Sequence, residues 1–224
     1  MPVRPTRRRV RAPDATREKI LSAAFAEIYQ RGFQAASLDT IVSQAGVTKG
    51  ALYHHFPNKA ALGYAVVDEV ITEPVLTAYL NPLETTDTDP LTALIQVVRR
   101  RADDFVAGGI ELGCPLNNLA QEMSPIDEEF RRRVGATLDA WTDGFARVLE
   151  RGQAEGHVRP DADPRRVAAF MVAAIEGAFG MAKNARSQPR LRSNLDQLAE
   201  FLESLRPPGS PVRRRRAKRP LQRR

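Results

Sequence analysis

The chain has 224 residues, of which 42% are apolar, and a formal net charge of +7. No stretch approaches the roughly 20 consecutive apolar residues of a membrane-spanning helix, and no apolar signal-peptide region follows the basic N-terminus. The single cysteine, Cys114, excludes an intrachain disulfide and is typical of a reducing compartment. We therefore expect a cytoplasmic protein without a membrane partner.

The positive charge is concentrated at the two ends of the chain. Residues 1–13 contain five arginines and no acidic residue, and residues 207–224 contain seven arginines, one lysine and no acidic residue. The body between them, residues 14–206, therefore carries a net charge of −6. The basic signal typical of nucleic-acid binding thus comes from the ends, and we expect the C-terminal one to be a disordered tail.

Between these ends the apolar pattern is helical almost throughout and predicts an all-α protein. A first helix, from about residue 14, carries one apolar stripe and ends at Gly32. Two short helices follow, capped by Ser37 and Thr48 and separated by a turn at Gly46, where a positive φ costs least. This arrangement is typical of a helix-turn-helix, in which one helix supports a short second helix that enters a DNA groove.

The remaining segments also predict helices. A fourth helix is expected over about 58–80, with a kink at Pro74 and a polar linker over 81–90. Further apolar stripes predict helices from about residues 91, 115, 130, 164 and 195. The last two have more apolar surface than one small domain covers, so we expect them to form a homodimer interface across a twofold axis.

The second helix of the helix-turn-helix carries side chains suited to DNA. Gly50 and Ala51 allow its backbone to approach a groove closely, and Lys49 can reach a phosphate or a guanine edge. Tyr53 and His54 lie one turn further on, where they can donate to phosphates. The other expected DNA contacts are Ser37, Thr40, Thr48 and Lys59. The alternative is an ordinary helical hairpin whose polar residues are merely solvated.

No metal or cofactor is expected. The adjacent residues His54 and His55 make a poor metal site, because neighbours on a helix point about 100° apart and no third ligand stands nearby in the sequence.

The segment GVTKGALYHHFPNKAAL, preceded by TREKILSAAFAEIYQRGF and SLDTIVSQAG, resembles the amino-terminal domain of the TetR family of transcriptional regulators. The resemblance covers about residues 14–70, and beyond residue 80 only the all-helical layout agrees with it. It implies operator contacts around Thr48, Lys49, Tyr53 and His54. It also implies repression, and a small-molecule effector held among the later helices.

Candidate effector-binding side chains follow in the second half of the chain: Phe105, Cys114, Asn117, Trp141, Phe145, Phe170, Met171 and Glu176. The aromatic and methionine residues are by default core residues. Glu176 is costly within an apolar helix unless it meets an arginine or faces a pocket or interface. Cys114 precedes a helix whose N-terminus can lower its pKa, as in a sensor of electrophiles, but we favour the ordinary interpretation, a small packed thiol.

We therefore predict a basic arm (residues 1–13), a DNA-binding domain (14–74), an effector-binding and dimerisation domain (75–206) and a basic tail (207–224). The predicted protein is a dimeric regulator that binds a palindromic double-stranded operator and is released by an effector. One alternative is a sequence-general DNA-binding protein driven by its tails. The other, an enzyme with Cys114 as nucleophile, is disfavoured because two of the three histidines lie in the DNA-binding module.

Overall fold

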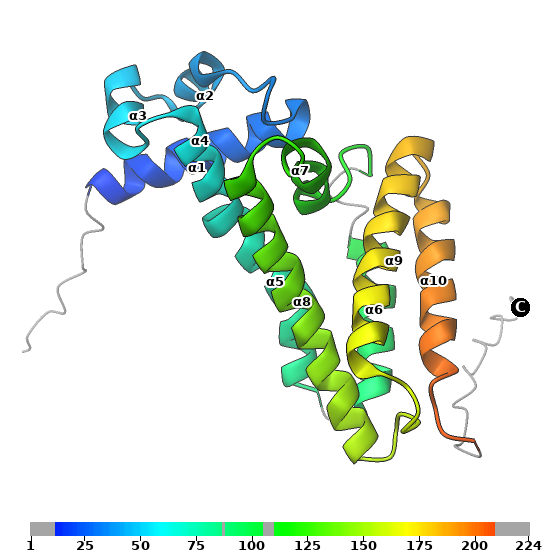
Figure 1. Cartoon of the computed structure of the whole chain (residues 1–224). Helices are drawn as coiled ribbons and strands as arrows, with labels where there is room; N and C mark the ends of the chain where they lie inside the picture. Colours follow the sequence, from blue (N-terminus) through cyan, green and yellow to red (C-terminus); the bar gives the residue numbers. More distant parts are fainter. Residues whose placement is uncertain (1–11, 87, 105–109, 209–224) are drawn as a thin grey trace, which may run out of the picture.

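The computed structural model describes residues 12–86, 88–104 and 110–208 (Figure 1). Within these ranges every regular element is helical, which confirms the predicted all-α fold. The helices are α1 (Ala12–Arg31), α2 (Leu38–Ala45), α3 (Lys49–His55), α4 (Lys59–Ala65), the π-helical η1 (Val66–Ile71), α5 (Thr72–Glu84), α6 (Pro90–Asp104), α7 (Pro115–Met123), α8 (Glu128–Ala154), α9 (Pro164–Ala185) and α10 (Gln188–Glu203). The basic arm and most of the basic tail lie outside the described residues.

Helices α1 to α4 form one end of the molecule, and the long helices extend away from it (Figure 1). The predicted stripe on α1 faces inward, with Ile20 and Ala24 fully buried, and it packs against Ile41 of α2 and Leu52 of α3. Gly46 turns the chain between α2 and α3 with a φ of +64°, as predicted. The helix-turn-helix therefore rests on a small apolar core.

The connection between the two halves differs from the predicted kinked helix. Helix α4 continues into α5 through the wide turn η1, and Pro74 lies in the first turn of α5. Proline cannot donate to the carbonyl one turn earlier, and its ring presses on that carbonyl, so the preceding turn widens. The expected linker also begins later, because α5 continues through Pro82 and buries Leu83.

The second half is a bundle in which α8 packs on α9, and α10 packs on α6 and α9. Its interior includes Trp141 and Phe145 of α8 and Met171 of α9, all fully buried. The outer face of α9 and α10 is different, since Phe170, Met181 and Phe201 remain exposed. None of the helices in the described ranges is long and apolar enough to span a bilayer.

Candidate nucleic-acid interface and buried polar cluster

Local hydrogen bonds set the start of each helix in the helix-turn-helix. The hydroxyl of Ser37 accepts from the Thr40 amide at 3.4 Å, and the hydroxyl of Thr48 accepts from the Ala51 amide at 3.1 Å. A side-chain oxygen that satisfies such an amide is the usual reason why serine and threonine begin helices. Ser37 and Thr48 are exposed and Thr40 is half-buried, so the capping residues share the outer surface with α3.

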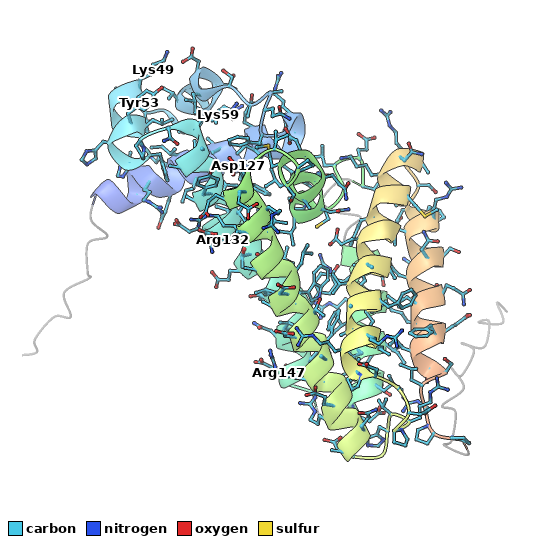
Figure 2. The ribbon with its side chains drawn as sticks, viewed as in Figure 1. Lys49, Tyr53, Lys59, Asp127, Arg132 and Arg147 are labelled. Atoms are coloured by element: carbon cyan, nitrogen blue, oxygen red, sulfur yellow. The ribbon has the colours of Figure 1, made fainter. Side chains whose placement is uncertain are left out.

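The outward face of α3 carries the predicted DNA-contacting side chains. Lys49, Tyr53 and His54 are exposed, while Leu52 and Phe56 point into the core. Lys49 and Tyr53 project from the end of the molecule remote from α9 and α10 (Figure 2). Tyr53 is 51% exposed, an unusual environment for a large ring on a short, well-packed helix. The face is therefore exposed and carries groups that can donate hydrogen bonds to DNA.

Gly50 also fits an external partner. A Cβ at this position would meet only the Thr48 hydroxyl, at 3.8 Å, so nothing within the chain requires glycine there. Ala51 beside it is half-buried. The absence of bulk at the start of α3 thus leaves the backbone open to close approach from outside.

An acidic residue, to which no sequence pattern pointed, lies on this face as well. The carboxylate of Asp39, in the first turn of α2, lies 2.6 Å from Lys49 Nζ, and both side chains are exposed. The hydrogen bond from Lys49 to Asp39 raises the pKa of Lys49. Lys49 is therefore charged, but it is paired with the Asp39 carboxylate, which would repel a DNA phosphate.

Asp39→Asn is expected to tighten DNA binding about threefold or more at low ionic strength, and by less as salt rises. The change removes a negative charge from the face and releases Lys49. Titration of a labelled duplex by fluorescence anisotropy at several salt concentrations measures the effect. Asp139→Asn, which removes an exposed charge from α8, is the matched control. An equal gain in both variants would mean that only overall charge matters.

Lys59 is already used within the chain. Its Nζ donates to the Gln34 carbonyl at 2.9 Å and lies 5.1 Å from the centre of the Phe33 ring. It thereby holds the turn between α1 and α2. An ammonium group has three protons, so the protons that do not bond to Gln34 can still make the predicted contact with a phosphate.

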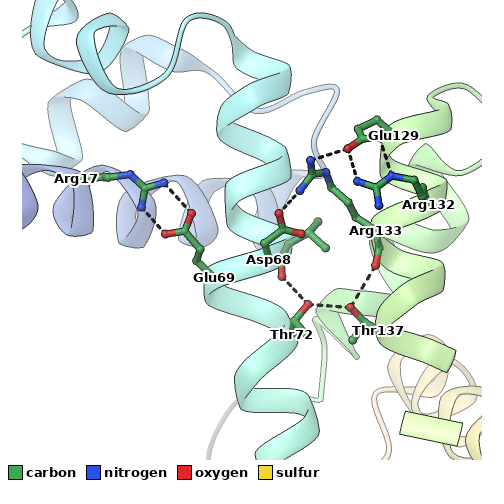
Figure 3. A network of polar contacts seen from close by, with 9 residues as sticks. Arg17, Asp68, Glu69, Thr72, Glu129, Arg132, Arg133 and Thr137 are labelled. Carbon is green, nitrogen blue, oxygen red and sulfur yellow. Dashed lines mark hydrogen bonds and ion pairs between the residues drawn. The ribbon is translucent and has the colours of Figure 1, made fainter. Parts of the chain in front are cut away.

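Polar contacts join η1 to α1 on one side and to α8 on the other (Figure 3). Arg17 of α1 makes a bidentate pair with Glu69, and this contact lowers the pKa of Glu69. On the other side of η1, Arg133 of α8 pairs with Asp68. The hydroxyls of Thr72 and Thr137 meet at 2.8 Å just below. Ion pairs from α1 and from α8 thus hold the wide turn in place.

Helix α7 forms a second link to the DNA-binding end. The Glu122 carboxylate accepts from the backbone amides of Phe33 at 2.9 Å and Gln34 at 2.8 Å, in the turn that follows α1. At the other end of α7, the Tyr29 hydroxyl of α1 donates to the Gly113 carbonyl. Both ends of α7 therefore hold α1 and the segment that leads into α2.

A cluster of polar side chains lies inside the second half, centred on Tyr79. The Tyr79 ring lies 4.2 Å from the Trp141 ring and 6.2 Å from the Phe145 ring, measured between centroids. The Arg101 guanidinium lies 5.0 Å from the centre of the same ring. Burial raises the pKa of Tyr79 strongly, and so do the nearby side chains of Cys114 and Glu176, whereas Arg101 lowers it. These groups from five helices therefore share one interior region.

Glu176 of α9 belongs to this cluster and is only 8% exposed. Neither of its carboxylate oxygens has a hydrogen-bond partner of ordinary geometry among the described residues, nor does the Trp141 Nε1. Burial raises the pKa of Glu176 to about 7, and the weak donor Cys114 acts against this rise. An arginine partner, one of the two possibilities for Glu176, is thus not found in the described part of the chain.

Cys114 is the residue that begins α7, and it is buried. Burial, and next the charge of Glu176, raise its pKa; the amides of Asn117 and Leu116 lower it by less. The lowering of this pKa by the helix N-terminus is therefore outweighed, because desolvation of the thiolate is the larger effect. A packed thiol agrees better with these surroundings.

Comparison with known proteins decides the family. The family model described as "Bacterial regulatory proteins, tetR family" matches residues 20–66, and "Tetracyclin repressor-like, C-terminal domain" matches residues 88–203. The chain belongs to the TetR family of transcriptional regulators.

Relatives and solved structures agree with this assignment. The transcriptional regulator AcuR of Cereibacter sphaeroides is 30% identical, over 82% of this chain and 84% of that protein. The transcriptional repressor DhaR of a Mycobacterium species is 28% identical, over 77% of this chain and 85% of that protein. The crystal structure of a TetR transcriptional regulator from Chloroflexus aurantiacus is 27% identical over 86% of this chain and 96% of that one, with a TM-score of 0.76.

The predicted effector residues of this TetR-family chain fall into separate places. Trp141, Phe145, Cys114 and Glu176 come together around Tyr79, with Met171 buried on α9. Phe170 does not belong with them, because it is 51% exposed and its ring lies 5.1 Å from that of Phe201 on the outer face. Phe170 therefore lies apart from the buried cluster, and its predicted effector contact stays a prediction. Phe105 lies outside the described residues.

Asn117 lies elsewhere again. It lines a half-open cleft of about 700 Å³ between α1, α7 and α9, together with Tyr29, Glu122 and Lys183. The Lys183 ammonium donates to the Asn118 side chain at 2.9 Å across this cleft. Groups of three or more potential metal ligands are not found in the described part of the chain.

Proposed function

We propose that this regulator is a dimeric repressor that binds a palindromic DNA operator through α3 and is released by a small-molecule effector. The observation that carries the proposal is the exposed face of α3, with Lys49, Tyr53 and His54 around a glycine that the fold does not require. The name of the relative DhaR, a transcriptional repressor, supports repression. We also propose cytoplasmic action and the predicted domain limits, 14–74 and 75–206.

A second copy of the chain is the proposed cover for the outer face of α9 and α10. This face exposes Phe170, Met181 and Phe201 around a groove of about 400 Å³. A Cβ added at Gly177, which lines this groove, would meet nothing within 4 Å, so another helix has room to approach closely. Large exposed side chains beside small residues are typical of a helical interface.

Selection of bound sequences from random DNA tests the proposal. A dimer with two α3 helices in successive major grooves requires half-sites centred about 34–36 Å, or one helical turn, apart. The full chain, and a variant trimmed of residues 1–13 and 207–224, should select the same palindrome. Loss of all sequence preference after trimming would instead support the sequence-general binder driven by the tails.

Tyr53→Ala is expected to weaken binding to the selected operator by about 1 kcal/mol or more, the scale of one charge-assisted hydrogen bond to phosphate. The fold should be unaffected, because the ring is half exposed and outside the core. Anisotropy titration measures the affinity, and thermal unfolding checks the fold. Wild-type affinity for the operator would show that another surface reads the DNA.

We further propose that α7 transmits the effector signal. Its first turn adjoins the buried cluster through Cys114, and its last turn holds the segment before α2 through Glu122. A ligand that displaces the start of α7 would therefore displace the DNA-reading helices. Effector and operator would then oppose each other through one coupling free energy.

Glu122→Gln is expected to weaken operator binding, because an amide can accept only one of the two backbone hydrogen bonds and turns its NH₂ toward the other. The lost bond is worth about 1–3 kcal/mol of stability. Urea unfolding and operator titration together measure the two effects. Glu111→Gln, at the rim of the same cleft, is the control. An operator affinity equal to that of the control would exclude Glu122 from positioning α2.

A further inference from the structure

We propose that the effector is a small organic amine, cationic at neutral pH, whose ammonium group pairs with Glu176 while its apolar body packs among Tyr79, Trp141 and Phe145. This inference rests on the proposed function, because it names the chemical class of the ligand that would release the operator.

The first step is the contrast between Glu176 and the other buried polar side chains. Among the described residues, Glu27 and Thr137 are also buried, but both have partners. Glu27 accepts from the Ser37 amide and pairs with Arg31, and Thr137 meets Thr72. Glu176 has no partner of this kind, although its oxygens are inaccessible to solvent. A carboxylate held this way costs several kcal/mol unless a cation compensates it.

The second step is the character of the surrounding groups. The rings of Tyr79, Trp141 and Phe145 lie within 4.2–6.2 Å of one another, and Glu176 is near enough to Tyr79 to raise the pKa of that phenol, so the neighbours of the carboxylate include an aromatic group. Aromatic faces attract cations, and one of them already carries the Arg101 guanidinium. That guanidinium lies over Tyr79 and makes no hydrogen bond to Glu176. An ionised Glu176 therefore has no counter-charge beside it until a ligand supplies one.

The third step distinguishes ligand classes. An ionised carboxylate only accepts hydrogen bonds, so it favours an ammonium group and repels a carboxylate ligand. A neutral alcohol could bond to Glu176 but would not compensate its charge. The Trp141 N–H, which also lacks a partner among the described residues, suits an acceptor atom elsewhere on the ligand. The chemistry thus favours an amine with an apolar body over anionic or neutral compounds.

The test uses the full chain, because Trp141 is its single tryptophan and reports directly on the cluster. The probes are 2-phenylethylamine and 4-phenylbutylamine, each with the alcohol and the carboxylate of matching length. We expect the amines to change Trp141 emission and to bind about tenfold or more tightly than the alcohols, which corresponds to roughly 1.4 kcal/mol. The carboxylates should bind most weakly.

Glu176→Gln should reduce amine affinity to that of the alcohols, whereas Glu150→Gln, at an exposed glutamate of α8, should leave it unchanged. Alcohols or carboxylates that bind as tightly as the amines would overturn the inference. So would amine binding that survives in Glu176→Gln, or a panel in which no amine alters Trp141 emission.

A parallel measurement separates this inference from the function on which it rests. Release of the selected operator is followed with the same compounds. A chain that selects a palindromic operator but responds only to anionic or neutral compounds keeps the proposed function and loses the amine. A chain that selects no operator loses the proposed function, while the amine affinities still decide the chemistry of the site.

Discussion

Replacing Glu176 with glutamine is expected to raise the free energy of unfolding by up to about 3 kcal/mol at pH 8, and by little at pH 5. The pKa of this carboxyl is raised from an ordinary 4.5 to about 7 by burial. Below pH 4.5 the group is neutral in both the folded and the unfolded states. Between pH 4.5 and 7 the unfolded chain ionises while the folded chain stays largely protonated, so wild-type stability falls, and the loss levels off above pH 7.

Glutamine keeps the shape of the side chain and cannot ionise, so the variant should lack this loss of stability. Urea unfolding at intervals between pH 5 and pH 8 measures the difference, in the absence of any amine. Glu150→Gln should follow the wild-type curve. Parallel pH profiles for wild type and Glu176→Gln would mean that the carboxyl titrates normally. A cluster that costs stability in the free protein is typical of a site built for a ligand.

Gly63→Ala is expected to destabilise the protein by about 1–3 kcal/mol, the usual cost of overpacking a core. A Cβ on Gly63 would lie 2.6 Å from the Phe130 ring and closer still to that of Phe33. These two rings are buried and pack edge to face at 4.7 Å, one from each half of the molecule. Rigid rings cannot move aside as a flexible chain end can.

Thermal and urea unfolding measure this loss, and operator titration should show weaker binding as well, since the overpacked rings join α8 to the DNA-binding end. Gly135→Ala on α8 is the control, because its added Cβ would meet nothing within 4 Å. That control should be stabilised by about 0.5–1 kcal/mol, as alanine is the better helix former. Equal effects of the two substitutions would rule out the contact at Gly63.

The helix-turn-helix could be predicted because its signals are local. Ser37, Gly46 and Thr48 fix the ends of two short helices through their own hydrogen bonds and backbone angles, within 12 residues of sequence. The caps and the turn between them also fix the orientation of α3 relative to α2, and therefore the face of α3 that is exposed. The later helices could be predicted in order because their apolar stripes are also local signals.

The buried cluster could not be predicted in this way. Tyr79 and Arg101 were missed because they lie on helices far apart in the sequence, and only packing brings them to Trp141. The exposure of Phe170 could not be foreseen, because a helix that is apolar nearly all round gives no indication of which face turns inward. The raised pKa of Cys114 could not be foreseen, because its cause is burial of the thiol near Glu176, and no local signal reveals that packing.

The wide turn η1 gives the long connection between the halves one compliant point. A regular helix resists bending over its whole length, but here the ladder of hydrogen bonds changes register over Val66–Ile71, with Arg17 and Arg133 gripping neighbouring carboxylates from opposite sides. The contacts that cross between the halves, such as the Phe33–Phe130 ring pair and the bonds of Glu122 to the turn after α1, tie the DNA-binding end to the bundle on the far side of this connection. A register change in the ladder and rigid contacts beside it would thus make any movement of the bundle reach α3 as a rotation and not as a stretch of the connecting helix.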